Sequence, residues 1–346
     1  MVCLLFILLM VFVAIFAYVL APDNTQNANQ GDLSIKSKPP GFEVLMLAVP
    51  IKNGPETSFS DYFFGRKEQF HKIPILDYKT DANKITYILY NDDPDIKVEK
   101  EIFLSDFPNS QNIQQAAENH IKSQKFLLGT DKSGRDYLSR MLIGSRVSIS
   151  IGFVAVFISL IVGIFFGSIA GYYGGKIDAF VMWLINIVWS IPTLLLVIAI
   201  TLTLGKGFWQ VFIAVGLTMW VEVARVVRGQ IISIKAQQFV TAAKALGYSH
   251  SRILRKHILP LVIAPIIVIS AANFASAILV ESGLSFLGLG AQPPTPSWGG
   301  MIKDSYGDII LGKPYLALIP GVAILLLTLS FMMVGNTLRD VLDVKN

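Results

Sequence analysis

The sequence predicts an all-α polytopic membrane protein with six transmembrane helices and a small external α+β insertion between the first and second helices. Of its 346 residues, 53% are hydrophobic and only 15% are charged, and the mean hydropathy is +0.56. An ordinary soluble domain carries more charge and less apolar surface. Each apolar run is near the roughly 20 residues that cross a hydrocarbon core. The runs cover residues 2–20, 147–170, 179–204, 207–224, 261–281 and 315–335.

The first run predicts a retained N-terminal transmembrane anchor over residues 1–20. A cleaved signal peptide is the alternative, but its apolar part usually spans about 7–15 residues and follows a basic region, which is missing here. Because no cytoplasmic tail precedes the run, a native start upstream of Met1 stays open. The single cysteine, Cys3, indicates neither a disulfide nor a lipid attachment.

Residues 21–126 predict an extracytoplasmic insertion domain. The runs 42–49, 84–90 and 96–103 are rich in β-branched and aromatic residues, and the last alternates like a half-buried strand. The polar segment 110–125 is expected to be helical. The sequence leaves open whether this domain contacts a partner, caps a transport path or is a passive insertion.

Glycines in the second span predict a close helix contact. Gly163, Gly167, Gly171 and Gly175 recur at every fourth position and therefore share one helix face. That face is expected to meet another helix, either within this chain or in a partner subunit. In later spans, Pro192 and Pro265 are expected to kink their helices, because proline removes a backbone hydrogen bond.

Few ionisable residues lie within or beside the expected spans, and each is a candidate for function. Glu222 precedes Arg225 by three residues on one helix face, which predicts a local ion pair near the membrane boundary. Glu281 has no charged neighbour in sequence, so its role stays open. The set comprises Asp178, Glu222, Arg225, Arg228 and Glu281.

The segment 225–260 is strongly basic, with seven Lys or Arg and no Asp or Glu. Basic short loops stay in the cytoplasm, so the spans predict that both termini are cytoplasmic and that residues 21–146 are outside. A helix over residues 235–246 is expected to end at Gly247, because glycine tolerates the left-handed conformation at a helix end. A second helix is expected to begin at Ser249, whose side chain could cap it.

Catalysis, nucleotide binding and metal binding are not predicted. Residues 171–177 superficially resemble a phosphate-binding loop but lack its glycine spacing and its Ser or Thr. The four histidines form no metal-ligand pattern. The net charge of +5 reflects membrane topology rather than nucleic-acid binding. We therefore expect no cofactor in this chain.

Residues 241–260 resemble the Glu-Ala-Ala coupling loop of ABC importer permeases, on which the transporter's ATPase docks. Thr241 stands where glutamate is usual and His257 where isoleucine is usual, and neither change disturbs the Ala-Ala-x-x-x-Gly pattern. The matching positions are Thr241, Ala242, Ala243, Gly247, His257, Leu259 and Pro260.

Three further stretches resemble the C-type subunit of the dipeptide/oligopeptide/nickel permease family: residues 128–146, 284–299 and 338–343. Within the first, Asp131, Arg135 and Asp136 are expected to form an ion-paired turn that is structural rather than a substrate contact. The signature positions there are Gly129, Thr130, Asp131, Gly134, Arg135 and Asp136.

The resemblance implies a type I importer permease core over residues 127–346, in a bacterial inner membrane. It implies a B-type permease partner, two cytoplasmic ATPases that bind the ATP, and an external binding protein that delivers a peptide. Nickel complexes and peptide antibiotics are alternative cargoes. An ion-coupled secondary transporter is a further alternative, but it would need paired ionisable groups and internal repeats that are not found in the sequence.

Overall fold

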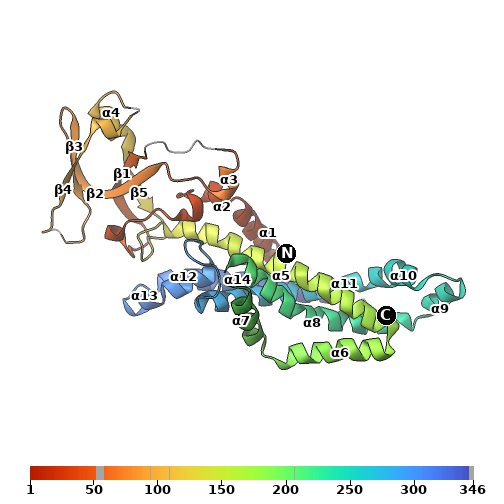
Figure 1. Ribbon diagram of the computed structural model, residues 1–346. Helices are drawn as coiled ribbons and strands as arrows, with labels where there is room; N and C mark the ends of the chain where they lie inside the picture. The colour runs from red at the N-terminus through yellow and green to blue at the C-terminus, as the bar shows by residue number, and fades with distance from the viewer. Residues whose placement is uncertain (52–57, 94, 109, 206, 343–346) are drawn as a thin grey trace. The chain divides into compact units, whose positions relative to one another are not determined.

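The computed structural model describes residues 1–346 except 52–57, 94, 109, 206 and 343–346 (Figure 1). The chain divides into two compact units. The helical unit comprises Met1–Val11, Val147–Gln292 and Gly321–Asn346, and the sheet unit comprises Phe12–Arg146 and Pro293–Pro320.

Four stretches among the described residues are helices long and apolar enough to cross a membrane. They are α5 (Tyr137–Tyr173), α8 (Phe208–Lys235), the run His250–Phe286 that ends in α11 (Leu259–Phe286), and α14 (Tyr315–Leu342). A bent pair, α6 (Gly175–Ser190) and α7 (Thr193–Leu204), provides a fifth span if it is counted as one. The expected first span is instead the 14-residue α1 (Val2–Ile15) followed by α2 (Ala17–Leu20).

The expected span over 179–204 is broken near its middle, because α6 and α7 meet at 92°. Proline disfavours the helical conformation of the residue before it, and Ile191 is extended at φ −96° and ψ 129°. Pro192 then precedes α7. The predicted kink at this proline is confirmed, whereas α11 continues through Pro265.

Close packing of α5 on α8 explains the glycine repeat. A Cβ added to Gly163, Gly167 or Gly171 would come within 2.5–2.8 Å of α8 atoms, closer than side chains tolerate. The repeat therefore serves a contact within this chain, and Gly175 instead begins α6 at φ +57°. Buried residues of α8 also pack against α7 and α11, for example Val215 with Val197 and Ala277.

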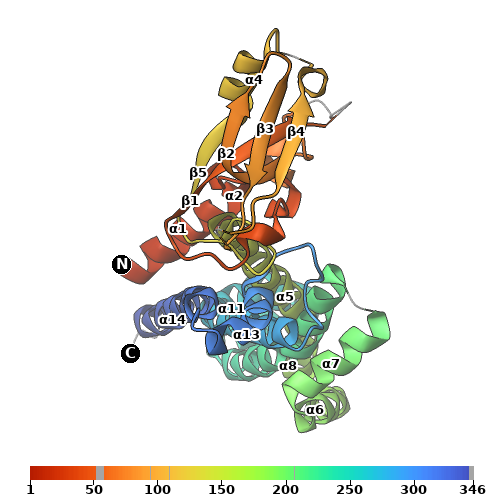
Figure 2. The ribbon, with the colours of Figure 1, turned by 90° about the vertical axis from the view of Figure 1, so that its left-hand side faces the viewer.

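The sheet unit contains a five-stranded antiparallel sheet in the order β4-β3-β2-β1-β5 (Figure 2). The strands are β1 (Phe42–Pro50), β2 (Phe70–Thr80), β3 (Lys84–Leu89), β4 (Glu99–Phe103) and β5 (Ile121–Phe126). Helix α4 (Ile113–His120) contributes Ile113, Ala116 and Ala117 to the core that the sheet forms around Leu47 and Ile85.

The expected helix over 110–125 is only partly correct, because α4 ends at His120 and the next six residues form β5. Strand β5 pairs with β1 from Ile121↔Leu47 to Phe126↔Phe42. Its two terminal residues are buried and its middle is polar, so the strand carries a weak alternation signal. Other short helices of the sheet unit are α3 (Asp61–Phe64), α12 (Trp298–Asp304), α13 (Tyr306–Ile310), η1 (Gln26–Ala28), η2 (Leu33–Ile35) and η3 (Leu104–Asp106).

Candidate functional site

The basic segment folds as a short helix, α9 (Gln238–Ala245), followed by a tight turn at Gly247. Gly247 adopts φ +76°, and its N–H donates to Lys244 O at 2.9 Å while Tyr248 N–H donates to Ala243 O at 3.2 Å. These two bonds form a Schellman motif, which satisfies carbonyls at the end of the helix. The predicted helix stop at Gly247 is confirmed.

Helix α9 has one buried and one exposed apolar face. Val240 and Ala243 are buried, in a cluster that also contains Ile253 and Ile258. Phe239 and Ala242 on α9 and Leu246 at its C-cap follow an i, i+3, i+7 pattern on the other face, and the two large members are 38% and 72% exposed. The two alanines that match the coupling loop therefore differ in burial. Ala243 packs inside the loop, whereas Ala242 lies on its surface.

The return segment contains α10 (His250–Arg252) and a π-helical turn, Ile253–Ile258. His257 lies in this turn, and its ring stacks on Tyr248 with centroids 5.7 Å apart and planes at 14°. Leu259 and Pro260 begin α11 directly after this turn. Ser249 is the N-cap residue as expected, but among the described residues its side chain makes no capping bond.

Several basic side chains of this segment remain exposed, and some contact aromatic residues. Lys235 Nζ donates to Tyr172 O at 2.5 Å, and the Tyr172 hydroxyl lies 2.9 Å from His250 Nδ1. The Arg252 guanidinium lies 4.7 Å from the ring centroid of Tyr248. The exposed basic residues are Lys244, Arg252, Arg255 and Lys256.

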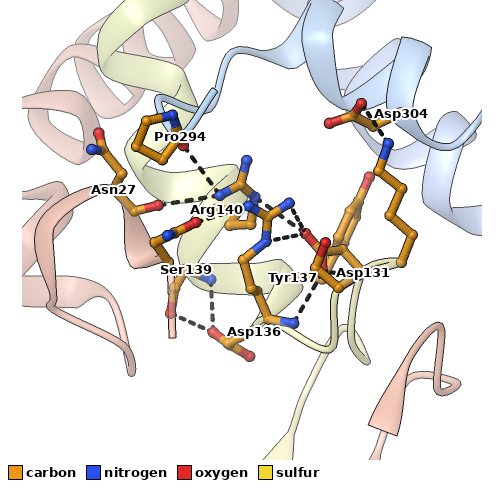
Figure 3. Close-up of polar contacts among 12 residues, drawn as sticks. Asn27, Asp131, Asp136, Tyr137, Ser139, Arg140, Pro294 and Asp304 are labelled. Carbon is orange, nitrogen blue, oxygen red and sulfur yellow. Dashed lines mark hydrogen bonds and ion pairs between the residues drawn. The ribbon is translucent and has the colours of Figure 1, made fainter. Parts of the chain in front are cut away.

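In the sheet unit, Asp131 is the centre of a polar turn (Figure 3). Its Oδ1 accepts from the backbone N–H of Ser133 at 2.8 Å and of Arg135 at 3.0 Å. Its Oδ2 accepts from Arg135 Nε at 2.7 Å and forms an ion pair with Arg140 Nε at 3.4 Å. Arg140 is 4% exposed, so Asp131 neutralises a buried cation.

The glycines of this turn are required by close backbone contacts. Gly129 and Gly134 have φ of +76° and +73°, and a Cβ on Gly134 would come within 1.8 Å of Asp32 O. The Thr130 hydroxyl donates to Ile35 O and accepts from Lys38 N–H. The signature positions therefore join the start of α5 to the segment 32–38.

Asp136 does not take part in the expected ion-paired turn. Its Oδ2 accepts from Ser139 N–H at 2.8 Å and from the Ser139 hydroxyl, as at the beginning of a helix (Figure 3). Burial raises the pKa of the Asp136 carboxyl, and the bonds from Ser139 oppose this rise. The ion-paired partner that sequence analysis missed is Arg140, nine positions after Asp131.

The expected local pair of Glu222 with Arg225 is wrong. The Arg225 guanidinium lies over the indole of Trp189, 3.5 Å from the ring centroid, and in the described part of the chain it forms no salt bridge with Glu222. Arg228 pairs with Asp178, and Glu281 accepts a bond from the Ser285 hydroxyl at 2.6 Å. A search of the described residues finds no group of three or more His, Cys, Asp or Glu that could hold a metal ion.

The sequence of residues 163–345 matches the family of binding-protein-dependent transport system inner membrane components. The chain belongs to this family. It is 43% identical over 223 residues to the dipeptide transport permease of Alkalihalophilus pseudofirmus, covering 64% of this chain and 73% of that protein. It is 39% identical to the oligopeptide transport permease of Bacillus subtilis, covering 64% of this chain and 73% of that protein. It is 40% identical to the glutathione transport permease of Escherichia coli strain 536, covering 66% and 75%.

Membership of the binding-protein-dependent transport family gives the chain a role as a multi-pass permease subunit of an inner membrane. Such a subunit is not itself an enzyme, because ATP hydrolysis belongs to separate subunits of the transporter. A partner permease, an ATPase and a substrate-binding protein accompany members of this family. The family match includes the whole basic segment 225–260.

Proposed function

We propose that this chain is the C-type permease subunit of an ATP-driven peptide importer with a type I permease fold. Three relatives at 39–43% identity carry permease names for dipeptides, oligopeptides and glutathione, which all contain peptide bonds. A peptide is the cargo class common to them. Two cytoplasmic ATPases, a B-type permease and an external peptide-binding protein complete the transporter.

The observation that carries the mechanism is the exposed apolar stripe on α9. Phe239, Ala242 and Leu246 lie on the face that this chain leaves uncovered, and Ala242 is small enough for close approach. An amphipathic helix of this kind binds in an apolar groove through residues at i, i+3 and i+7. The groove belongs to the ATPase, and nearby Lys244 and Arg252 favour an acidic rim.

Buried contacts connect this docking face to the spans. Val240 and Ala243 on α9 pack in one cluster with Val227 of α8 and Val262 of α11. A rigid cluster of this kind moves as a unit when ATP closes the two ATPases. The movement then favours one of two packings of α8 and α11, which is what alternating access requires.

The topology follows from the same assignment. The part of the 225–260 segment that contains α9 must face the ATPases in the cytoplasm, which also agrees with the basic composition of the segment. Both termini are then cytoplasmic, and the domain 21–126 lies outside, where the binding protein arrives. The turn at Asp131, with Gly129, Thr130 and Gly134, has a structural role rather than contacting the substrate.

Reconstitution tests this function. The chain is purified with its B-type permease and ATPases in proteoliposomes, and ATP-dependent uptake of labelled peptide is measured with the binding protein present. Leu246→Asp is expected to abolish uptake and ATPase copurification, because a charge in an apolar groove is costly. Leu311→Asp is the control, since Leu311 is 73% exposed in the sheet unit and should tolerate the charge. Equal uptake by both variants would contradict the docking assignment.

A further inference from the structure

A cavity in the helical unit lies at the bend between α6 and α7. It has a volume of about 190 Å³, and α6, α7, α8 and α11 all contribute to its lining. Trp189 and Thr193 line it from either side of the break at Pro192, while Glu222 and Ser276 line it from α8 and α11. Backbone that leaves the helical conformation at membrane depth is tolerated where it is buried in protein or lines a water-filled cavity.

Glu222 brings a carboxyl group to this cavity. In the described part of the chain no basic side chain forms an ion pair with it, and Arg225 is engaged with Trp189 instead. Asp178 on α6 is already paired with Arg228. An unpaired carboxylate within a membrane-spanning segment is costly, and a cation that enters the cavity would stabilise its charged form.

We propose that Glu222 binds the positively charged amino group of the peptide cargo as it passes through the transporter. This inference rests on the proposed function. A broken helix that lines a polar cavity is a recurrent way to build a substrate site in membrane transporters. Trp189 and Thr193 lie on either side of the helix break, and both line the cavity together with Glu222. The break, the cavity and the carboxyl group are therefore found at one place.

The size and lining of the cavity agree with one end of a peptide rather than a whole peptide. Drug-sized ligand pockets are usually about 300–1,000 Å³, so a cavity of about 190 Å³ accommodates roughly one residue. The hydroxyls of Thr193 and Ser276 can accept hydrogen bonds from an ammonium group whose charge is met by Glu222. The apolar members Val188, Leu196 and Val280 suit the side chain of that residue.

Cysteine labelling tests the cation preference without depending on transport. Thr193→Cys is made in a Cys3→Ser background, so that one thiol of this chain lies in the cavity, and the assembled transporter is used. Its reaction rates with a cationic and an anionic methanethiosulfonate reagent are compared. Glu222→Gln is expected to lower the cationic-to-anionic rate ratio about tenfold, because it removes the nearby negative charge. Asp340→Asn, which removes an exposed carboxylate on α14, should leave the ratio unchanged.

Peptide protection then identifies the ligand. A dipeptide with a free amino group should slow labelling of the Thr193→Cys thiol, and its N-acetylated form should protect at least about tenfold less well. Glu222→Gln should remove that difference. Equal protection by both peptides would overturn the assignment of the amino group.

Other outcomes also overturn the proposal. An unchanged rate ratio in Glu222→Gln, or a thiol that neither reagent reaches, would mean that the cavity does not receive cations. Loss of the B-type permease on purification of Glu222→Gln, with peptide protection unchanged, would assign the carboxylate to the subunit interface. Failure of the parent complex to import any peptide would instead contradict the proposed function, and the labelling ratio would still decide whether the cavity attracts cations.

Discussion

Arg228 on α8 donates from Nε and Nη2 to the two carboxylate oxygens of Asp178 on α6, at 2.5 and 2.6 Å. Both side chains are mostly buried, and the pair joins the first turn of α6 to the helix that leads into the basic segment. A bidentate arginine–carboxylate pair has fixed geometry and is stronger than a neutral hydrogen bond.

Breaking this pair should therefore destabilise the helical unit. Arg228→Lys keeps the charge but loses the two-pronged contact, and we expect a loss of about 1–3 kcal/mol in unfolding free energy. Thermal unfolding of the purified protein measures it. The double variant Arg228→Gln with Asp178→Asn should lose less than the sum of the two single variants, and strict additivity would mean that the pair contributes nothing.

Asp131 and Asp136 provide a matched comparison in the sheet unit. Asp131→Asn leaves the buried Arg140 without its counter-charge, so we expect a loss of about 3 kcal/mol. Asp136→Asn keeps an oxygen that accepts the bonds from Ser139, so its effect should stay below about 1 kcal/mol. Hydrogen exchange of the peptide 129–140 measures both, and an equal loss in the two variants would contradict the different roles assigned to them.

The raised pKa of Asp136 predicts a pH dependence of stability. Burial raises its pKa above the ordinary value of 3.8, so the folded protein holds this proton more tightly than the unfolded chain does. The associated stabilisation is complete below pH 3.8 and is lost as the pH rises through the higher folded pKa. Subtracting the pH profile of Asp136→Asn from that of the parent protein isolates this contribution. A difference that grows in favour of the parent as the pH rises would contradict the sign.

Gly247 and Gly229 separate backbone conformation from packing. A Cβ on either would meet nothing within 4 Å, but only Gly247 has a positive φ, of +76°. Gly247→Ala should cost about 1–2 kcal/mol locally, whereas Gly229→Ala lies in a helix and should be neutral or slightly stabilising.

The same comparison extends to transport. Replacing Gly247 with Val should uncouple ATP hydrolysis from peptide uptake, because the turn that positions α9 would change while the spans remain inserted. Uptake per ATP hydrolysed in proteoliposomes is the measurement. An unchanged ratio in Gly247→Val would show that the turn does not transmit the movement.

The glycine repeat makes a further packing prediction. A Cβ on Gly167 would lie 2.5 Å from the backbone oxygen of Ala224, an atom that cannot move aside without shifting α8. Gly167→Ala should therefore cost about 1–3 kcal/mol. Gly321→Ala on α14 meets nothing within 4 Å and is the control. Equal unfolding temperatures for the two variants would argue against close packing of α5 on α8.

Features that depend on local backbone chemistry could be predicted from the sequence. Gly247 ends its helix because of its own φ, and Pro192 breaks its span because of its ring and its effect on Ile191. The coupling-loop positions were identified by their resemblance to the Glu-Ala-Ala loop of ABC importer permeases. Which of them face outward could not be predicted, because burial of Ala243 depends on Ile253 and Ile258 in the return segment.

Charge pairing was predicted less well, because partners are chosen by tertiary contacts. Arg225 was expected to bind Glu222 three residues away, but it lies on Trp189 from a different helix. Asp178 and Arg228 were recognised as candidates, although their pairing across 50 positions has no sequence signal. The same holds for Arg140, which reaches Asp131 only because the turn between them folds back.

Copurification from the native membrane tests the central claim most directly. The tagged chain is extracted in mild detergent, and its partners are identified by mass spectrometry. We predict a second permease and ATPase subunits with the parent protein, and loss of the ATPases alone when Phe239 on α9 and Leu246 at its C-cap are both replaced by Asp. Retention of the ATPases by that variant would contradict docking on α9, and recovery of the chain without any partner would contradict the importer assignment.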